Sequence, residues 1–233
     1  MKNIQPVLIE NIWSEYLVET YPSNYFDFFI DIGARGTKHP WHVHNIAKNN
    51  PQTKIIALEP DLPYYNEIVK KKDELGLENL TIIPYGLGAG ESIQIPDGKT
   101  ETISLPDILE KYDLDISKTW AFKIDCEGCE RHVMNEECVD ILKQCDHFGV
   151  EFHGTNCGAN YFTDKYELFE DMSVNRARGA DNMSEAESWL TDNFDSSHEM
   201  FVTDMVSGLA SYVVVNREIL NSENRPEFWD SIT

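Results

Sequence analysis

The sequence predicts an open α/β fold, in which a mostly parallel β-sheet carries helices on both faces and an antiparallel hairpin at one edge. Five apolar runs alternate with stretches long enough for helices. Near-continuous apolar strands of this kind are typical of parallel sheets that are covered on both sides. Two further apolar runs near the C-terminus are joined by a short connection, which favours an antiparallel pair.

Each element follows from the local pattern. The predicted parallel strands are residues 26–32 (FDFFIDI), 54–58 (KIIAL), 80–83 (LTII), 120–124 (WAFKI) and 148–152 (FGVEF). The predicted helices are 41–49, 62–75, 104–112 and 131–143 between these strands, and 160–172 and 184–193 after them. The hairpin strands are 200–203 and 211–215, which brings the expected sheet to seven strands. Residues 4–20 are expected to form a helix that packs on the sheet or caps it.

The 233 residues suffice for one domain with a core that needs no disulfide or metal to stabilise it. We expect an N-terminal helical cap over 1–24, a ligand-binding core over 25–154, and helices with the edge hairpin over 155–233. An apolar share of 41% with 11% aromatic residues is ordinary for a folded domain, so the acidity does not indicate disorder.

The chain carries 19 Lys and Arg against 41 Asp and Glu, a formal net charge of −22. Proteins that bind nucleic acid show a basic footprint, so this balance predicts no nucleic-acid partner. For the same reason we expect no binding to anionic membranes. No stretch approaches the roughly 20 apolar residues of a membrane span, and the opening MKNIQPVLIENIW does not resemble a signal peptide. A cytoplasmic location is the simplest expectation, and the oligomeric state is open.

The cysteines are five in number and lie in the second half of the chain. An odd count without a secretory signal favours reduced thiols. Cys126 and Cys129 have the spacing of a redox or zinc pair, but no second pair lies at zinc-finger distance. The spacing alone is therefore a weak signal for either site.

In an open parallel sheet, ligands bind beyond the carboxyl ends of the strands, near the point where the strand order reverses. The residues that follow each predicted strand are therefore the candidate site. Gly33 and Gly36 permit a tight turn and the close approach of a ligand, although they do not make a G-x-G-x-x-G fingerprint. Glu59 can accept hydrogen bonds from both hydroxyls of a ribose, or it can belong to the start of the next helix. Gly86 lies in an apolar loop that either flanks a purine ring or is a plain turn.

Asp125 ends the fourth strand, and we expect it in the same layer as Asp31 and Glu59. The fifth strand ends with Glu151 and His153, which period-two alternation places on one face. These residues belong to five segments that together resemble the FkbM-type methyltransferases. The segments are Phe29–Gly36, Ile56–Asp61, Ser104–Leu109, Phe122–Glu130 and Val150–His153, and the K-I-D-x-E-G-x-E block over residues 123–130 is the most specific of them.

The resemblance covers about residues 25–154 and implies the Rossmann-like fold of class I methyltransferases, with S-adenosylmethionine as cofactor. It implies methylation of a hydroxyl on a sugar, a glycan or a small metabolite. It also places Cys126 and Cys129 at variable positions of the block, which implies two reduced cysteines at a strand end. The cofactor-binding residues it implies are Asp31, Gly33, Ala34 and Gly36 for the methionine part, Glu59 and Pro60 for the ribose, Gly86 and Leu87 for the adenine, and Asp125 for the amino group or the acceptor.

Transfer to an oxygen also requires the loss of a proton. His153 is the first candidate for the base because its ordinary pKa lies near neutrality. Glu151 is the second candidate, or it pairs with Lys123 instead. Asp125, Glu151 and His153 could also hold a divalent metal, although this is the less favoured interpretation. Two other functions remain: an NAD-dependent oxidoreductase, which the missing third glycine disfavours, and a cofactor-binding protein without catalysis.

Overall fold

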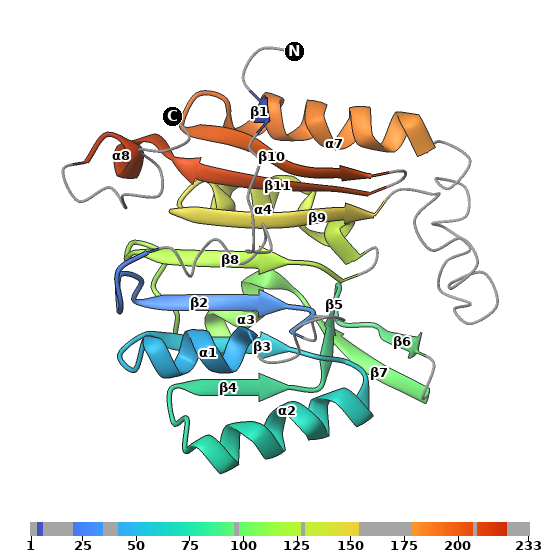
Figure 1. Cartoon of the computed structure of the whole chain (residues 1–233). Helices are drawn as coiled ribbons and strands as arrows, with labels where there is room; N and C mark the ends of the chain where they lie inside the picture. The colour runs from blue at the N-terminus through green and yellow to red at the C-terminus, as the bar shows by residue number, and fades with distance from the viewer. Residues whose placement is uncertain are drawn as a thin grey trace.

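The computed structural model of the chain describes residues 4–6, 21–34, 42–95, 98–126, 129–153, 179–206 and 209–222. Its main feature is an eight-stranded sheet in the order β1-β10-β11-β9-β8-β2-β3-β4 (Figure 1). The strands are β1 (Ile4–Pro6), β2 (Phe28–Ile32), β3 (Lys54–Leu58), β4 (Leu80–Ile83), β8 (Trp120–Ile124), β9 (His147–His153), β10 (His198–Val206) and β11 (Leu209–Asn216).

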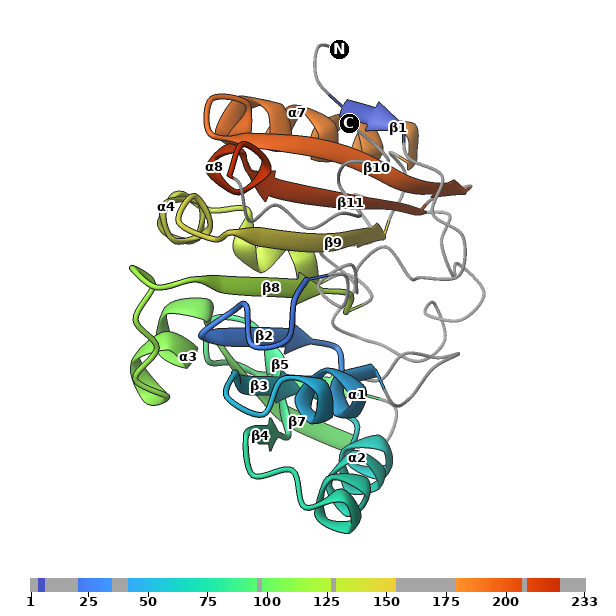
Figure 2. The ribbon, with the colours of Figure 1, turned by 60° about the vertical axis from the view of Figure 1, so that its left-hand side comes forward.

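The helices cover both faces of this sheet (Figures 1 and 2). They are α1 (His42–Asn49), α2 (Leu62–Leu75), α3 (Leu105–Lys111), the 3-10 helix η2 (Cys129–Val133), α4 (Glu136–Leu142), α7 (Gly179–Phe194) and α8 (Arg217–Leu220). Three short strands form a second sheet in the order β5-β7-β6: β5 (Tyr85–Leu87), β6 (Ser92–Ile95) and β7 (Gly98–Ile103).

The predicted fold class is confirmed. Strands β4, β3, β2, β8 and β9 pair in parallel, and β11 and β10 continue the sheet in antiparallel pairing. The strand order reverses between β2 and β8, because the chain builds outward from β2 through β3 to β4 and then returns to β8 on the other side. This is the switch point at which open α/β sheets bind ligands.

Local sequence explains where the helices begin. Ser104 caps α3 by accepting from the N–H of Asp107, and Asn135 caps α4 by accepting from the N–H of Cys138. Helix α2 has a proline in its first turn, where no backbone N–H is needed, and ends at Gly76 with φ +64°. These signals place the predicted helix over 62–75 at its observed bounds.

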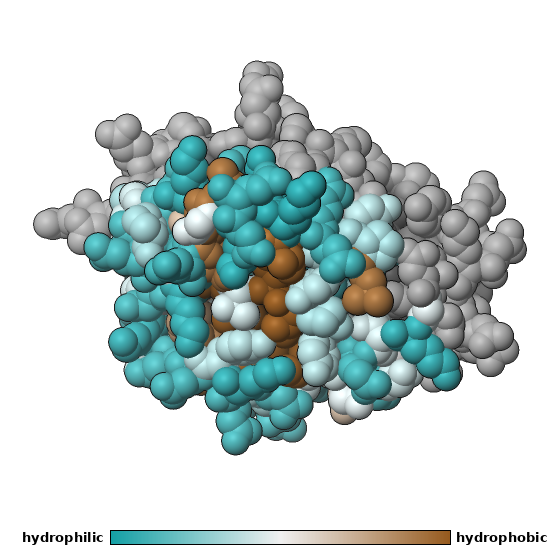
Figure 3. All heavy atoms as spheres, turned by 90° about the horizontal axis from the view of Figure 1, so that it is seen from below, coloured by the Kyte–Doolittle hydropathy of each residue, from teal (hydrophilic) through white to brown (hydrophobic). Residues whose placement is uncertain are grey.

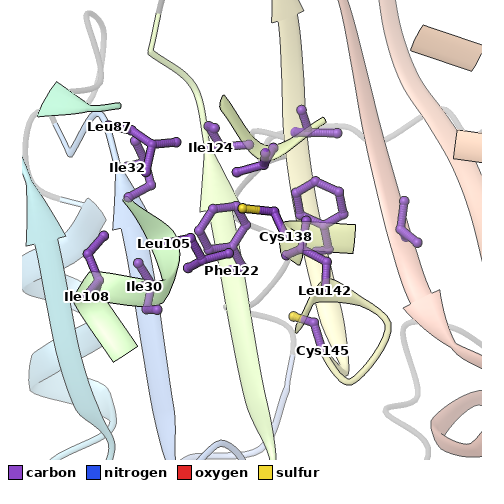
Figure 4. Close-up of a cluster of buried hydrophobic side chains, with 14 of the residues drawn as sticks. Ile30, Ile32, Leu87, Leu105, Ile108, Phe122, Ile124, Cys138, Leu142 and Cys145 are labelled. Carbon is purple, nitrogen blue, oxygen red and sulfur yellow. The ribbon is translucent and has the colours of Figure 1, made fainter. Parts of the chain in front are cut away.

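The strands separate two buried clusters by their alternation. One face, with Ile30, Ile32, Phe122 and Ile124, packs against α3, α4 and α7 (Figure 4). The opposite face carries apolar side chains from the same strands that pack against α1, α2 and α8, including Phe29, Ile55, Ala57, Ala121 and Val213. Asp31 and Lys123 lie on this second face by alternation, deep among apolar neighbours.

Three expectations differ from the structure. Ile4–Pro6 is a strand parallel to β10 rather than helix, and the rest of the expected 4–20 helix lies outside the described residues. The segment around Gly86 is strand β5, not a flexible loop, because it pairs with β7. The predicted helix over 131–143 is divided into η2 and α4, with Asn135 as the cap between them. The expected helix over 160–172 also lies outside the described residues.

The edge of the molecule that carries β4 and α2 is hydrophilic around a narrow apolar strip (Figure 3). The exposed large hydrophobic side chains among the described residues are Leu62 and Leu75, at the two ends of α2. None of the described helices is both long and apolar enough to cross a membrane.

His147 is buried at the amino-terminal end of β9, and its burial should make the stability of the protein depend on pH in the acid range. Burial lowers the pKa of His147 to about 3, and Tyr21 Oη lies 3.2 Å from its Nδ1. Since an unfolded histidine has a pKa near 6.5, the unfolded state binds the extra proton between these values. The free energy of unfolding should therefore fall as the pH drops below about 6.5, with a slope of at most about 1.4 kcal/mol per pH unit from this residue.

Replacing His147 with phenylalanine, which keeps an aromatic ring but cannot titrate, should flatten this dependence in urea unfolding between pH 6.5 and 4. Burial, with Glu218 and Asp27 nearby, raises the pKa of the adjacent Asp146 to about 6, so this carboxyl acts in the opposite direction. It is present in both proteins, so the difference between them isolates His147. An unchanged slope in the variant would show that His147 does not control acid stability.

Candidate functional site

Four residues form a row along the carboxyl ends of the central strands. Ile32 is level with Leu58 of β3 and Ile124 of β8, and Ile124 is level with Val150 of β9. The residues that follow these positions are therefore neighbours across the sheet: Glu59, Gly33, Asp125 and Glu151. Glu59 and Asp125 thus flank Gly33 at the switch point, and Glu151 lies on the far side of Asp125. Asp31 lies two residues back, level with Ala57 and Lys123, so the expected common layer of Asp31 with Glu59 and Asp125 was wrong.

Position 33 requires glycine for two reasons, its backbone conformation and the close approach of Asp125. Its φ is +74°, and a Cβ built on it would lie 1.8 Å from the backbone oxygen of Asp125. The N–H groups of Gly33 and Ala34 both donate to the carbonyl of Leu58, at 3.0 Å each. The turn after β2 is therefore held by β3 on one side and lies directly against the end of β8 on the other.

Lys123 fixes the same turn from below. Its ammonium lies 3.1 Å from Asp31 Oδ1, and both side chains are fully buried. It also donates to the carbonyls of Gly33 at 2.6 Å and Ile32 at 3.2 Å. The two buried charges neutralise each other. The lysine also orients the carbonyl of Ile32, the last residue of β2, and that of Gly33, the first residue of the turn. Sequence reasoning placed Asp31 at the ligand and considered Glu151 as the partner of Lys123; the signal it missed was one charged residue at the same depth of two adjacent apolar strands.

Glu59 is 6% exposed at the end of β3. Its Oε1 accepts from the N–H of Asp61 at 2.9 Å, and Asp61 is the N-cap of α2. Glu59 therefore stabilises the turn through Pro60 into α2 and is not itself the cap. A carboxylate held by its own turn is fixed in orientation, which suits it to recognise a ligand beside Gly33.

The end of β8 differs from the expectation at its cysteines. Asp125 is partly exposed, and its N–H donates to Ile32 O at 3.1 Å. Cys126 and Cys129 are joined by a disulfide, so the expectation of two reduced cysteines was wrong. Their Cα atoms lie 5.5 Å apart, within the range that a disulfide spans. Residues 127 and 128 of the block lie outside the described residues.

The end of β9 places Glu151 beside the antiparallel strand β11. Ser211 is level with Glu151 and donates from Oγ to its Oε2 at 3.2 Å. Ser211 was not singled out from the sequence, because only the pairing of β9 with β11 brings it to this position. His153 is the last residue of β9, paired with Leu209, and its side chain is not among those described.

Gly86 and Leu87, the two residues expected beside the adenine, lie in β5. Gly86 is buried, and Leu87 is 2% exposed within the core cluster, next to Ile32 (Figure 4). Leu87 therefore lies close to the end of β2, where it packs as a buried residue of the core. Gly36 and residues 154–178 lie outside the described ranges. Among the side chains that the structure describes, no three His, Cys, Asp or Glu residues are grouped so as to hold a metal ion.

No known protein family and no curated protein matches the sequence. Solved structures do match the fold. A protein provisionally described as an rRNA methylase from Clostridium thermocellum superimposes with a TM-score of 0.52 at 10% identity, over 87% of this chain and 92% of the other. An rRNA methylase from Streptococcus thermophilus and a provisionally described methyltransferase from Streptococcus mutans in complex with S-adenosylhomocysteine each give 0.49 at 8% identity. Each match covers 87% of this chain, and 93% and 94% of the respective partner. The match to the Clostridium thermocellum protein shows that this chain shares the fold of that protein.

The first of these structures corrects the exclusion of nucleic acid as a partner. The Clostridium thermocellum protein is provisionally described as an rRNA methylase, and it shares this fold over most of both chains. A net charge of −22 is a sum over the whole chain, whereas RNA recognition depends on local surfaces, base stacking and contacts with the 2′-hydroxyl. Net acidity therefore does not exclude an RNA partner.

Proposed function

We propose that the chain is a methyltransferase that binds S-adenosylmethionine at the carboxyl ends of β2, β3 and β8. The observation that supports this most strongly is the row of Glu59, Gly33 and Asp125 at the switch point of the sheet. It combines a carboxylate suited to ribose hydroxyls, a turn without a side chain, and a second carboxylate suited to an ammonium group. These donors and acceptors fit the three polar parts of the cofactor.

Within this site the residues divide into contact and support. Glu59 would accept hydrogen bonds from the ribose, with Pro60 fixing its turn. Asp125 would face the amino group or the acceptor, while Gly33, Ala34 and Gly36 would border the methionine part, and Gly86 and Leu87 the adenine. Asp31 has no exposed surface and is ion-paired with Lys123, so we assign it to the support of the glycine turn. When bound, the cofactor supplies an electrophilic methyl group on a sulfonium.

We further propose that the acceptor is a hydroxyl of a sugar, a glycan or a small metabolite, as the resemblance to the FkbM-type enzymes suggests. The chain must align this oxygen and remove its proton. Glu151, oriented by Ser211, and His153 are the candidate bases at the end of β9. Methyl transfer should therefore be assayed with a panel of sugars and with RNA, since both carry hydroxyl groups. The compound that becomes methylated identifies the class of acceptor.

The cofactor assignment predicts that Glu59→Gln weakens binding of S-adenosylhomocysteine. Glutamine keeps one acceptor oxygen, so the variant loses about one of the two hydrogen bonds from the ribose hydroxyls to a charged group. Such a bond contributes about 1.5–3 kcal/mol, which corresponds to a loss of affinity of about 10-fold to 100-fold. Isothermal titration calorimetry of the full chain measures this directly.

Glu67→Gln is the matched control, because Glu67 is an exposed carboxylate on the adjacent helix α2. It should leave the affinity unchanged. If the unmodified protein does not bind S-adenosylhomocysteine, the proposed cofactor is wrong. If it binds and Glu59→Gln binds equally well, the cofactor lies elsewhere.

A further inference from the structure

We propose that Cys126 and Cys129 form a reversible thiol–disulfide exchange site that a dithiol reductant opens, and that opening it weakens cofactor binding. The second part rests on the proposed methyltransferase function, and the first part does not. Nothing in the catalytic scheme uses these cysteines, although they lie directly beside the row of carboxylates.

The disulfide is placed where it can influence the site. Cys126 follows Asp125, whose backbone oxygen lies against Gly33 and whose N–H is bonded to Ile32. Cys129 begins η2, in which Glu130 and Val133 are buried. The disulfide thus ties the end of β8 to a helix that is anchored in the core. It is therefore a second restraint on the chain beside Asp125, in addition to the backbone hydrogen bond from Asp125 to Ile32.

A purely structural role explains the disulfide poorly. It joins cysteines only three positions apart, and such a short loop restricts the unfolded chain least. Both cysteines are partly exposed, so a small reductant can approach them.

The other described cysteines behave differently. Cys138 and Cys145 lie in the core cluster (Figure 4), and burial raises the pKa of both thiols, that of Cys145 well above its ordinary value. Buried thiols with a raised pKa react slowly. Among the described cysteines, exchange is therefore directed to the pair at the rim of the site.

The chemistry is ordinary thiol–disulfide exchange. A thiolate of the reductant attacks one sulfur of the pair, the bond between Cys126 and Cys129 breaks, and a mixed disulfide forms. The second thiol of the reductant then attacks this mixed disulfide. The reductant leaves as a disulfide, and its two electrons and two protons remain on Cys126 and Cys129 as thiols.

Reduction should loosen the turn that carries Asp125. The cofactor must then order this turn when it binds, and the cost of ordering lowers the affinity. We expect the dissociation constant of S-adenosylhomocysteine to rise about fivefold or more, which is the lower range of coupling between two sites.

The experiment compares the air-oxidised full chain with the same protein after dithiothreitol. Alkylation followed by peptide mass spectrometry reports which thiols are free, and calorimetry reports the affinity for S-adenosylhomocysteine. We expect Cys126 and Cys129 to become alkylated only after reduction, together with weaker binding. The double variant Cys126→Ser/Cys129→Ser should bind as weakly as the reduced protein, with or without dithiothreitol. Cys138→Ala is the matched control and should keep the response to reduction.

Either of two results would overturn the proposal: alkylation of Cys126 and Cys129 before reduction, or equal affinity in both redox states. If neither state binds S-adenosylhomocysteine, the proposed function fails together with the effect on affinity. The alkylation pattern then decides the first part: thiols that appear at Cys126 and Cys129 only after dithiothreitol support it, and thiols that stay unreactive after dithiothreitol contradict it. Amide hydrogen exchange at residues 125 and 129–133 tests separately whether reduction loosens this turn, and equal exchange in the two states contradicts the loosening.

Discussion

Replacing Gly33 with alanine should destabilise the protein by about 2–5 kcal/mol and abolish binding of S-adenosylhomocysteine. The left-handed backbone at φ +74° costs a residue with a Cβ about 1–2 kcal/mol. The new methyl group would also lie 1.8 Å from the carbonyl oxygen of Asp125, which is backbone and cannot rotate away. Relief requires that the ends of β2 and β8 separate, at a cost of about 1–3 kcal/mol.

Gly76→Ala provides the matched control for this experiment. Gly76 has a similar φ of +64°, but nothing lies within 4 Å of the position its Cβ would take. It should therefore show the backbone cost alone, about 1–2 kcal/mol, and normal binding. Urea unfolding of both variants separates the two contributions. An equal loss of stability in the two variants would mean that the clash between the new methyl group and the carbonyl oxygen of Asp125 costs no free energy.

Replacing Lys123 with methionine should cost about 3–5 kcal/mol, because it leaves the fully buried carboxylate of Asp31 without the cation that neutralises it. The variant also removes the donor to the carbonyls of Ile32 and Gly33. We expect both lower stability in urea unfolding and weaker binding of S-adenosylhomocysteine.

A second substitution separates the two effects. Lys123→Met/Asp31→Asn removes the uncompensated charge with an isosteric neutral group, so most of the lost stability should return. The affinity should stay low, because the carbonyl of Gly33 still lacks the donor that Lys123 supplied. Recovery of both properties in the double variant would show that Lys123 acts only as the partner of Asp31 and does not position the turn.

Much of the fold followed from local patterns. The runs FFIDI, KIIAL, LTII and WAFKI are strands because residues buried on both faces must be apolar at nearly every position. Helix α2 matches its predicted bounds because a proline in its first turn and a glycine after its last turn mark them. The segment 85–103 was missed as a sheet, because its three short strands depend on pairing between themselves and not on a local period.

The candidate site was predicted in part for the same reason. Gly33, Glu59, Asp125 and Glu151 could be named because each follows a recognisable strand, and the carboxyl ends of parallel strands share one edge. The sequence by itself therefore determined the order of the elements and which residues border that edge.

Only the tertiary structure decided how these residues are paired. The register between β2 and β8 sets Asp31 against Lys123, a disulfide joins Cys126 to Cys129, and the antiparallel pairing of β11 with β9 brings Ser211 to Glu151. Register and strand order arise from contacts between segments far apart in the chain, whose energies no local pattern contains. For this reason the sequence suggested that Asp31 binds a ligand, whereas in the fold Asp31 is fully buried and paired with Lys123.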